Sequence, residues 1–309
     1  MILAFCWSTW GAEQVDVPRE TMSSNPQIPA YVPNLVNDHM VSGEKFALVY
    51  NDRYKALETS PKPDISKIGQ YYDSENYVSH TDGRSGLFER AYQIAKRFAI
   101  GRKLRLIRSL HPETGRILDY GAGTGDFLEE SKRAGWNVFG IEPNERARIL
   151  ASKKGVDLVA ERSELSIEKF DVITLWHVLE HLHDLDASIE YLVKHLADTG
   201  LLIIAVPNYR SWDAQHYGSH WAAYDVPRHL WHFSKHSMEV LFKGRLELFD
   251  IRPMRLDAFY VSLLSERYRN NRFGWPAAIW SGIRSNAYGR RHHEYSSHIY
   301  CFRKLTSDD

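Results

Sequence analysis

The sequence predicts an α/β fold with a doubly wound, mostly parallel sheet, and three observations lead to that prediction. From about residue 116 onward, apolar runs with the length of buried strands alternate with segments of helical periodicity. The first run, 116–120, ends in a glycine-rich turn that leads directly into a helical pattern. A carboxylate, Glu142, follows the next run about 20 residues downstream. Alternating strands and helices imply a parallel sheet with helices on both faces.

The order of the elements follows from these runs. One or two helices are expected from residue 86 to about residue 110, leading into the sheet. Strands are then expected at 116–120, 137–142, 157–160, 170–176, 200–206, 246–252 and 296–304. Helices are expected between them at 125–135, 144–154, 185–197 and about 235–243.

The first part of the chain differs from this alternating pattern. Residues 1–84 are punctuated by prolines and are expected to form a partly irregular N-terminal extension, with a hairpin from 46–50 to 54–57. Within it, the aromatic and polar segment 71–80 fits a lid or pocket wall as well as it fits an extension packed on the core. Residues 85–309 are expected to form the main domain.

An insertion at 254–295 separates the last expected strand from the one before it. The segment is aromatic and basic, and 259–269 fits an amphipathic helix. A cap over a pocket and a dimer contact both fit this composition, so a homodimer is one expected assembly.

Composition argues against several classes of protein. The 309 residues include 39 Lys and Arg and 39 Asp and Glu, so the formal net charge is zero and nothing supports a nucleic-acid partner. No apolar run approaches the roughly 20 residues of a membrane span. Cys6 and Cys301 are the only cysteines, which implies no disulfide framework and fits a reducing cytoplasm.

The glycine turn after the first strand is the strongest functional signal. Gly121, Gly123 and Gly125 let the backbone bend tightly and let a ligand approach without a Cβ in the way. Dinucleotide sites use G-x-G-x-x-G with a pyrophosphate at the helix N-terminus, whereas here the third glycine comes one residue early. Asp126 beside the turn and Asp119 at the strand end disfavour a pyrophosphate. They suit the cationic amino-acid end of S-adenosyl-L-methionine (SAM).

These residues resemble the motifs of the class I SAM-dependent methyltransferases. Leu118-Asp119-x-Gly121-x-Gly123-x-Gly125 is similar to their first motif, and Gly140-Ile141-Glu142-Pro143-Asn144 is similar to their second. The resemblance implies a Rossmann-like, seven-stranded, mostly parallel sheet in which the last strand inserts antiparallel between its neighbours. Members of the same group often carry a Cys-rich zinc module near the N-terminus. This chain lacks those cysteines, so we expect no zinc there.

The expected cofactor is therefore SAM, and its binding residues come from the ends of several strands. Glu142 can accept both ribose hydroxyls, and a carboxylate or hydroxyl after the third strand can accept the adenine amino group. The expected cofactor-binding residues are Asp119, Gly121, Gly123, Gly125, Asp126, Phe127, Glu142, Pro143, Ser163, Glu164, Trp176 and His177.

The segment after the fourth strand, Trp176-His177-Val178-Leu179-Glu180-His181, contains H-x-x-E-H, which is also a zinc-peptidase pattern. That pattern needs a long helix around the motif, but here a strand precedes it directly, so we disfavour zinc hydrolysis. The segment resembles the fourth-strand loop of small-molecule O-methyltransferases of the ubiquinone-pathway type. These often carry E-x-x-E-H, and some use it to hold a divalent cation. His177 replaces the first glutamate, which weakens a magnesium site, so we expect no metal.

A His-rich block follows the strand at 200–206 and is too long for an ordinary connection. Long loops on a rigid sheet are where substrate recognition tends to reside, and part of this block resembles a recurring segment of the same methyltransferase group. The expected substrate contacts are Tyr224, Arg228, His229 and His232. The alternative for Arg228 is a structural pair with Asp225.

The expected function is transfer of a methyl group from SAM to an oxygen of a small-molecule acceptor, with carbon or nitrogen as alternatives. An oxygen nucleophile benefits from a base with a pKa near neutrality, for which histidine is suited. The candidates for this catalytic role are His177, His181, His229 and His232, and His181 is the first choice, followed by His177. A nicotinamide-dependent oxidoreductase and a non-catalytic SAM-binding protein are the competing functions, because fold alone does not decide function.

Overall fold

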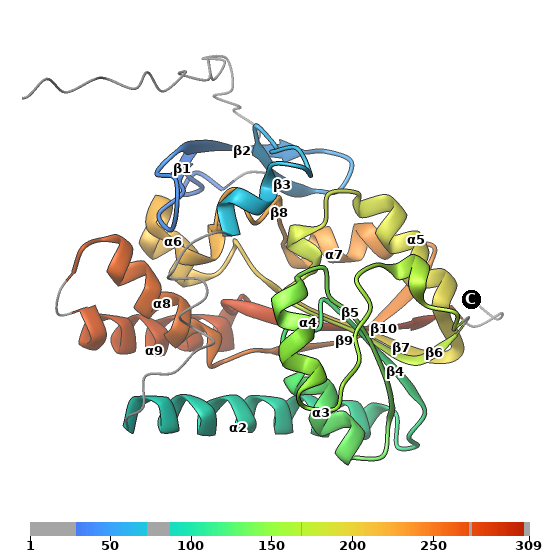
Figure 1. The fold of residues 1–309 in the computed structure, drawn as a ribbon. Coiled ribbons are helices and arrows are strands. Elements are labelled where there is room, and N and C mark those ends of the chain that lie inside the picture. The colour runs from blue at the N-terminus through green and yellow to red at the C-terminus, as the bar shows by residue number, and fades with distance from the viewer. Residues whose placement is uncertain (1–28, 73–86, 168, 272–273, 306–309) are drawn as a thin grey trace, which may run out of the picture.

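Two β-sheets organise the computed structural model, which describes residues 29–72, 87–167, 169–271 and 274–305, with only the backbone of 87–95. The larger sheet lies at the centre of the molecule, and the smaller one covers its upper edge in Figure 1. The predicted lid or wall at 71–80 lies mostly outside the described residues. No helix in these ranges is long and apolar enough to cross a membrane.

The larger sheet has the strand order β5-β4-β6-β7-β10-β9. Its strands are β4 (Arg116–Tyr120), β5 (Asn137–Ile141), β6 (Phe170–Trp176), β7 (Leu196–Pro207), β9 (Leu246–Pro253) and β10 (Ser297–Lys304). β4 pairs parallel with β5 and β6, and β6 pairs parallel with β7. β10 lies between β7 and β9 and runs antiparallel to both, as predicted for the last strand.

One expected strand, 157–160, is almost absent. Val159 forms a single parallel bridge to Ile141, so the described part of the sheet has six strands where seven were expected. The pairing stops because the chain turns immediately afterwards. Glu161 and Glu164 form a capping box around the short 3-10 helix η2 (Arg162–Glu164), which takes the backbone away from the sheet edge.

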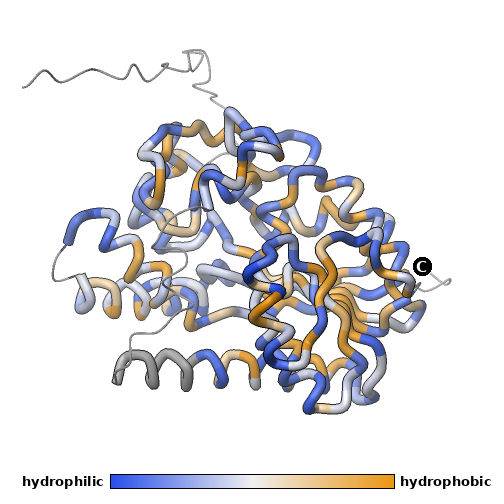
Figure 2. The backbone as a smooth tube through the Cα atoms, in the orientation of Figure 1, coloured by the Kyte–Doolittle hydropathy of each residue, from blue (hydrophilic) through white to orange (hydrophobic). Residues whose placement is uncertain are grey.

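Helices cover both faces of this sheet (Figure 1). They are α2 (Leu87–Leu110), α3 (Asp126–Arg133), α4 (Glu145–Ser152), α5 (Leu185–His195) and α7 (Lys235–Phe242). Side chains of Asn144, Asp184 and Ser234 accept backbone N–H bonds and cap three of these helices. The central strands form a nearly continuous apolar core, visible as the orange centre of Figure 2.

The smaller sheet joins the N-terminal extension to the rest of the chain. It has the order β1-β2-β3-β8, with β1 (Leu35–Asn37), β2 (Lys45–Asn51), β3 (Ala56–Ser60) and β8 (Trp231–His232). β2 and β3 form the predicted hairpin, but β3 begins two residues later and ends three residues later than expected. β8, however, comes from the His-rich block and pairs with β3, so this sheet crosses the boundary expected at residue 84. The 3-10 helix η1 (Ile68–Tyr72) follows β3 in the chain.

The remaining helices come from the segment after β6, the His-rich block and the insertion. The His-rich block contains α6 (Trp212–Tyr217) and the 3-10 helices η4 (Gly218–His220) and η5 (Ala222–Tyr224), while η3 (Leu179–His181) follows β6. The insertion at 254–295 forms a hairpin of α8 (Asp257–Tyr268) and α9 (Gly274–His292). α8 corresponds to the helix expected at 259–269 and begins two residues earlier.

Candidate active site

The glycine turn lies between β4 and α3 and has the backbone that its sequence requires. Gly121 and Gly123 have φ angles of 78° and 53°, in the left-handed region that favours glycine. A Cβ on Gly121 would come 2.5 Å from a methyl carbon of Val178, whereas a Cβ on Gly123 would enter open space. Gly121 therefore permits close packing of the turn, and Gly123 leaves room above it for a ligand.

Glu142 lies directly across from this turn. Its Oε2 accepts a hydrogen bond from the Gly123 N–H at 2.8 Å, and its Oε1 accepts one from the Asn144 N–H at 2.8 Å. These two backbone donors hold the carboxylate at the rim of the turn. Each oxygen keeps further acceptor capacity, so Glu142 can accept a pair of vicinal hydroxyls.

Asp119, at the end of β4, is 3% exposed and accepts a hydrogen bond from Thr174 Oγ1 at 2.7 Å. Burial raises the pKa of this carboxyl to about 7, although Thr174 and Lys103 oppose the shift. Asp119 therefore changes its charge near neutral pH, and a bound cation would favour its ionised form.

Asp126 behaves differently from the sequence expectation. Its carboxylate pairs with Lys96 at 2.8 Å and with Lys154 at 3.0 Å. Burial raises the pKa of Asp126, but Lys96, Thr124 and Lys154 outweigh that effect and hold the pKa below its usual value. Two lysines thus neutralise the charge that was expected to repel a pyrophosphate. The preference for SAM over a dinucleotide therefore depends on the glycine spacing and on Glu142, and not on the charge of Asp126.

A cavity of about 900 Å³ opens above the turn. Of the expected cofactor-binding residues, it is lined by Asp119, Gly121, Gly123, Asp126, Phe127, Glu142 and Trp176. Gly125, Pro143, Ser163, Glu164 and His177 do not line it. Gly125 and Pro143 are neighbours of lining residues in the chain.

Ser163 and Glu164 lie in η2, outside this cavity. Glu164 Oε1 accepts backbone N–H bonds from Ala160 at 3.0 Å and from Glu161 at 2.8 Å. The Ser163 hydroxyl is 3.4 Å from a carboxylate oxygen of Glu161. Their visible role is to cap η2, and contact with an adenine ring stays a prediction.

Lys103 of α2 is a cavity residue that the sequence did not reveal. Its Nζ lies 4.1 Å from the centroid of the Trp176 ring, within the range of a cation–π contact. Burial lowers the pKa of Lys103, while the carboxylates of Asp119 and Asp257 act against that shift. No local motif marks Lys103, because only the packing of α2 against the sheet places it beside the turn.

His177 follows Trp176 and has an unusual backbone, with φ of 58° in a residue that is not glycine. Its Nδ1 lies 3.4 Å from Glu180 Oε1, and its Nε2 lies 3.2 Å from Asp257 Oδ2. Burial alone would lower the pKa of His177, but Asp257 and Glu180 together raise it to about 10. His177 is therefore an imidazolium at neutral pH and a poor proton acceptor.

His181 has the opposite electrostatic character. Burial, together with the nearby His229, lowers its pKa to about 4, so the ring is neutral at neutral pH. Its Nδ1 lies 2.9 Å from the Arg228 carbonyl oxygen and 3.0 Å from the Tyr72 hydroxyl. The ring meets the His229 ring edge-on at a centroid distance of 4.6 Å. His181 does not line the cavity above the glycine turn, nor the second cavity described below.

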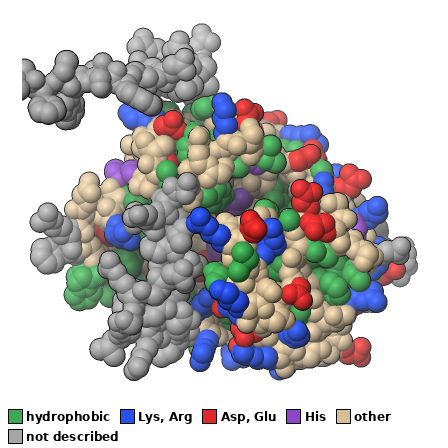
Figure 3. Space-filling view, in the orientation of Figure 1, with side chains coloured by type: hydrophobic (Ala, Val, Ile, Leu, Met, Phe, Trp, Pro, Cys, Tyr) green, Lys and Arg blue, Asp and Glu red, His purple; other side chains and the backbone are tan. Residues whose placement is uncertain are grey.

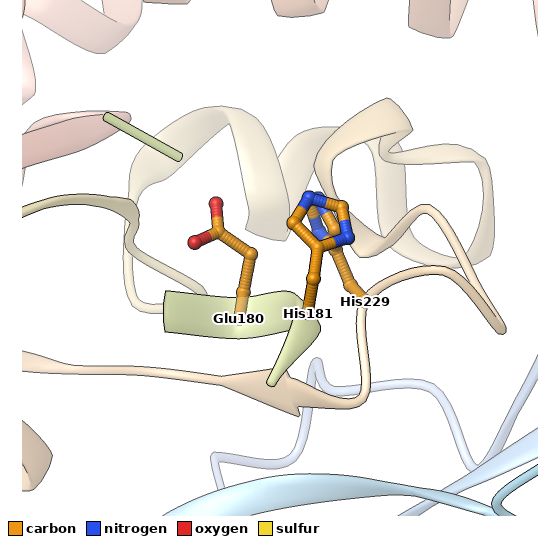
Figure 4. A group of neighbouring side chains, drawn as sticks. All are labelled: Glu180, His181 and His229. Atoms are coloured by element: carbon orange, nitrogen blue, oxygen red, sulfur yellow. The ribbon is translucent and has the colours of Figure 1, made fainter. Parts of the chain in front are cut away.

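Glu180, His181 and His229 form one group in the described part of the chain whose donor atoms lie close enough to share a metal ion, within 4.8 Å of one another. Their side chains stand together in Figure 4. Both imidazole Nδ1 atoms already contact backbone carbonyls, at Arg228 and Ala223, so a metal ion would have to bind at the Nε2 atoms. Two imidazoles and one carboxylate favour a softer ion than magnesium. The expectation that no metal binds stays a prediction.

A second cavity, of about 450 Å³, lies on the other side of the end of β6. Its lining is contributed by the His-rich block, α8 and the N-terminal extension, and it includes His177, Asp225, His229, Asp257, Tyr260 and Leu264. Trp176 lines the first cavity and His177 lines the second. Two consecutive residues thus separate a site above the glycine turn from a smaller pocket with apolar walls.

The four expected substrate residues occupy different environments. His229 lines the second cavity, whereas Tyr224, Arg228 and His232 are buried and do not. The Tyr224 ring packs edge-on against Trp221 and His232. His232 Nε2 lies 3.0 Å from the Thr59 hydroxyl on β3, which ties the block to the smaller sheet.

Arg228 forms a buried ion-pair network instead of a cavity wall. Its guanidinium is 1% exposed and contacts Asp38 at 2.9 Å and Asp225 at 2.7 Å. It also donates to the Tyr71 carbonyl oxygen at 2.9 Å. Arg228 thus joins the N-terminal extension to the His-rich block. The pair with Asp225 is the structural alternative that the sequence offered for Arg228. Asp38 and Tyr71 of the N-terminal extension are additional partners.

This fold and this site define a class I methyltransferase domain, and comparison with known proteins agrees. The chain matches the model of a family described as a methyltransferase domain over residues 90–245, which is half of its length. The chain belongs to that family, which confirms the resemblance inferred from the glycine and Glu142 motifs.

Curated relatives are similar over part of the chain. A ubiquinone biosynthesis O-methyltransferase of Chelativorans sp. (strain BNC1) is 38% identical over 111 residues, 33% of this chain and 44% of the relative. A protein of the same name from Actinobacillus pleuropneumoniae serotype 5b (strain L20) is 26% identical over 169 residues, 50% of this chain and 72% of the relative. The chain spans less than half the length of the Chelativorans protein and of several similar relatives.

A solved structure supports the fold. The magnesium protoporphyrin IX methyltransferase of Synechocystis PCC 6803, solved with bound SAH, superimposes with a TM-score of 0.52 at 12% identity, covering 78% of this chain and all of the other. At this identity the similarity shows a shared α/β methyltransferase architecture.

Proposed function

We propose that this protein transfers a methyl group from SAM to an oxygen of a small-molecule acceptor. The observation that carries the proposal is the pair of neighbouring cavities, one lined by Trp176 and the other by the next residue, His177. One has the glycine turn and carboxylates suited to a nucleoside with a cationic tail. The other is a pocket of about 450 Å³, which suits a small molecule.

The residues of the larger cavity fit SAM. The open space above Gly123 accepts a ligand close to the backbone, and Glu142 is held where it can accept the ribose hydroxyls. Asp119 is buried, with Thr174 as a hydrogen-bond donor, and can pair with the ammonium group. Lys103 lies beside Trp176 and can pair with the carboxylate of the same ligand. When bound, SAM supplies a methyl group on a sulfonium, which is already a good leaving group.

The chain's own contribution is to align the acceptor and accept its proton. His229 lines the smaller cavity, and its Nδ1 lies 2.9 Å from the Ala223 carbonyl oxygen, which leaves Nε2 as the proton acceptor. We therefore favour His229 as the base. His181, the first choice from the sequence, packs against the His229 ring and is better placed to position it. The charged His177 holds Asp257 at the cavity wall.

Calorimetric titration with SAM and with NAD, followed by a labelled-methyl assay across phenols, carboxylates and amines, tests the proposal. We expect SAM to bind and phenols to accept the methyl group. Binding of NAD in place of SAM would support the oxidoreductase alternative. Binding of SAM without transfer to any acceptor class would support the non-catalytic alternative.

Two further expectations accompany this proposal. A homodimer was expected as one assembly of the chain, and sedimentation equilibrium across a range of concentrations tests it. A cytoplasmic location was expected from cysteine usage, and cell fractionation tests that.

A further inference from the structure

The α9 helix presents an apolar stripe to solvent. Trp275, Ile279 and Ile283 are 63%, 47% and 55% exposed. Their spacing of four residues places them along one side of the helix. Hydrophobic side chains gather over this helix at the lower left of Figure 3. Large apolar side chains arranged in this way are characteristic of a surface that binds another surface.

An arginine-lined groove lies between α2 and the connection from β9 to α8. It encloses about 510 Å³, and Arg102, Arg105, Arg252 and Arg255 contribute to its walls. Arg252 pairs with Asp250 at 2.6 Å, while the described structure shows no ion pair for the other three. The groove therefore carries a net positive charge, and its chemistry suits phosphate groups.

The apolar stripe and the groove adjoin each other. Asn286 Nδ2 donates to the Arg255 carbonyl oxygen at 2.9 Å, which fixes the side of α9 that faces the groove. Ile279, Ile283 and Arg290 lie seven, three and four residues from Asn286, respectively, so they share that side of the helix. One face thus combines exposed apolar residues of α9 with arginines of α2, α9 and the β9–α8 connection.

We propose that this face docks on an anionic phospholipid bilayer. Tryptophan and isoleucine insert at the boundary between headgroups and acyl chains, while the arginines bind lipid phosphates. The helix lies on the bilayer and does not span it, which agrees with the absence of a long apolar helix in the described residues. The inference rests on this face alone and is independent of methyl transfer.

Charge favours a lipid over the other occupants of such a face. α9 contains no Asp or Glu and ends with Arg290, Arg291 and His292. A second copy docked on the same face about a two-fold axis would bring these arginines together, and the like charges would repel. A nucleic acid would pair with the arginines but would leave the Trp275–Ile279–Ile283 stripe without an apolar partner. An anionic bilayer offers an apolar partner to the stripe and phosphate groups to the arginines.

Co-sedimentation of the full chain with vesicles tests the proposal. One set of vesicles contains phosphatidylcholine alone, and the other contains phosphatidylcholine with phosphatidylglycerol. We expect the chain to bind the anionic vesicles more tightly, and added salt to weaken that binding. The double variants Trp275→Ser/Ile279→Ser and Arg105→Glu/Arg255→Glu should each weaken it about tenfold or more.

The matched control is Ile65→Ser/Lys45→Glu, which changes an exposed apolar and an exposed basic residue of the N-terminal extension. It should bind vesicles like the unmodified chain, and circular dichroism should show all variants folded. Three results would overturn the proposal: no binding to anionic vesicles, equal binding to both vesicle types, or folded face variants that bind like the control. Loss of a dimer or of nucleic-acid binding in the variants, without vesicle binding, would assign the face to another partner.

Discussion

Asp257, the first residue of α8, lies 3.2 Å from Nε2 of His177 at the end of β6. This contact ties the α8–α9 insertion to the strand that separates the two cavities. His177 is held on its other side by Glu180 at 3.4 Å, so one imidazole connects two carboxylates from distant segments. The smaller cavity, which His177 and Asp257 both line, thus owes part of its shape to an ion pair.

Replacing Asp257 with Asn should lower the pKa of His177, because Asp257 is the strongest of the partners that raise it to about 10. The raised pKa means that the pair stabilises the fold fully below pH 6.5 and loses this effect as the pH rises through about 10. Since His177 is 35% exposed, we expect the variant to lose only about 1 kcal/mol of unfolding free energy at neutral pH. An NMR titration of His177, with denaturant unfolding, measures both. An unchanged His177 titration would contradict this account.

Replacing Arg228 with Met should destabilise the fold strongly. The substitution leaves Asp38 and Asp225 without their buried cation, and breaking such a pair costs about 3–5 kcal/mol. The matched control is Arg53→Met, which removes an exposed ion pair with Asp186 and should cost less than about 1 kcal/mol. Urea unfolding compares them. Equal losses would show that the network does not hold the N-terminal extension in place.

The affinity for SAM should rise with pH near neutrality. Burial raises the pKa of Asp119 to about 7, and the ligand's ammonium group favours the ionised carboxylate. The stability of the free protein should depend on pH in the opposite direction. The contribution of Asp119 to the free energy of unfolding is fully present below its unfolded pKa of 3.8 and is lost as the pH rises through about 7. Asp119→Asn should remove both pH dependences. Calorimetry at several pH values would show a persisting slope in the variant if another group were responsible.

Two glycines of the turn should respond differently to substitution. Gly121→Ala places a Cβ against Val178 and should destabilise the fold by more than the strain of a positive φ, about 1–3 kcal/mol. Gly123→Val meets open space and adds only the strain of its positive φ, about 1–3 kcal/mol, so the variant should stay folded but lose SAM binding. Thermal unfolding and calorimetry separate these effects. Unchanged affinity in Gly123→Val would place the ligand elsewhere.

His229 and His181 should differ in kinetics. If His229 is the base, His229→Gln should lower kcat about 100-fold or more, while SAM affinity stays the same. His181→Gln should have a smaller effect on kcat, because His181 contacts the His229 ring and not the cavity. Steady-state kinetics with the best acceptor compare the two. A larger loss of kcat in His181→Gln than in His229→Gln would instead identify His181 as the base.

The sequence predicted the paired strands of the larger sheet well because they have strong local signals, whereas the short strands β1 and β8 were not predicted. The run 116–120 and its glycine turn depend on neighbouring residues and lie where expected, and the hairpin is present with its second strand, β3, shifted by two to three residues. The strand at 157–160 was wrong in extent because its end is decided by the capping box of Glu161 and Glu164. Local apolar character alone did not show how early that turn begins.

The site was harder to predict, because distant residues decide its electrostatics. Lys96 and Lys154 neutralise Asp126, and Asp257 charges His177. None of these partners is near its carboxylate or imidazole in the sequence. The three-way contact of Arg228 with Asp38, Asp225 and Tyr71 likewise joins segments separated by more than 150 positions. Such contacts become visible only when the chain is folded.

Calorimetric titration of the full chain with SAM, beside the Glu142→Gln variant, tests the central claim most directly. We predict one SAM site per chain and a loss of affinity of about tenfold or more in the variant, because residue 142 would no longer present a carboxylate to the ribose. Equal affinity in the two proteins, or heat released by NAD and none by SAM, would contradict this prediction.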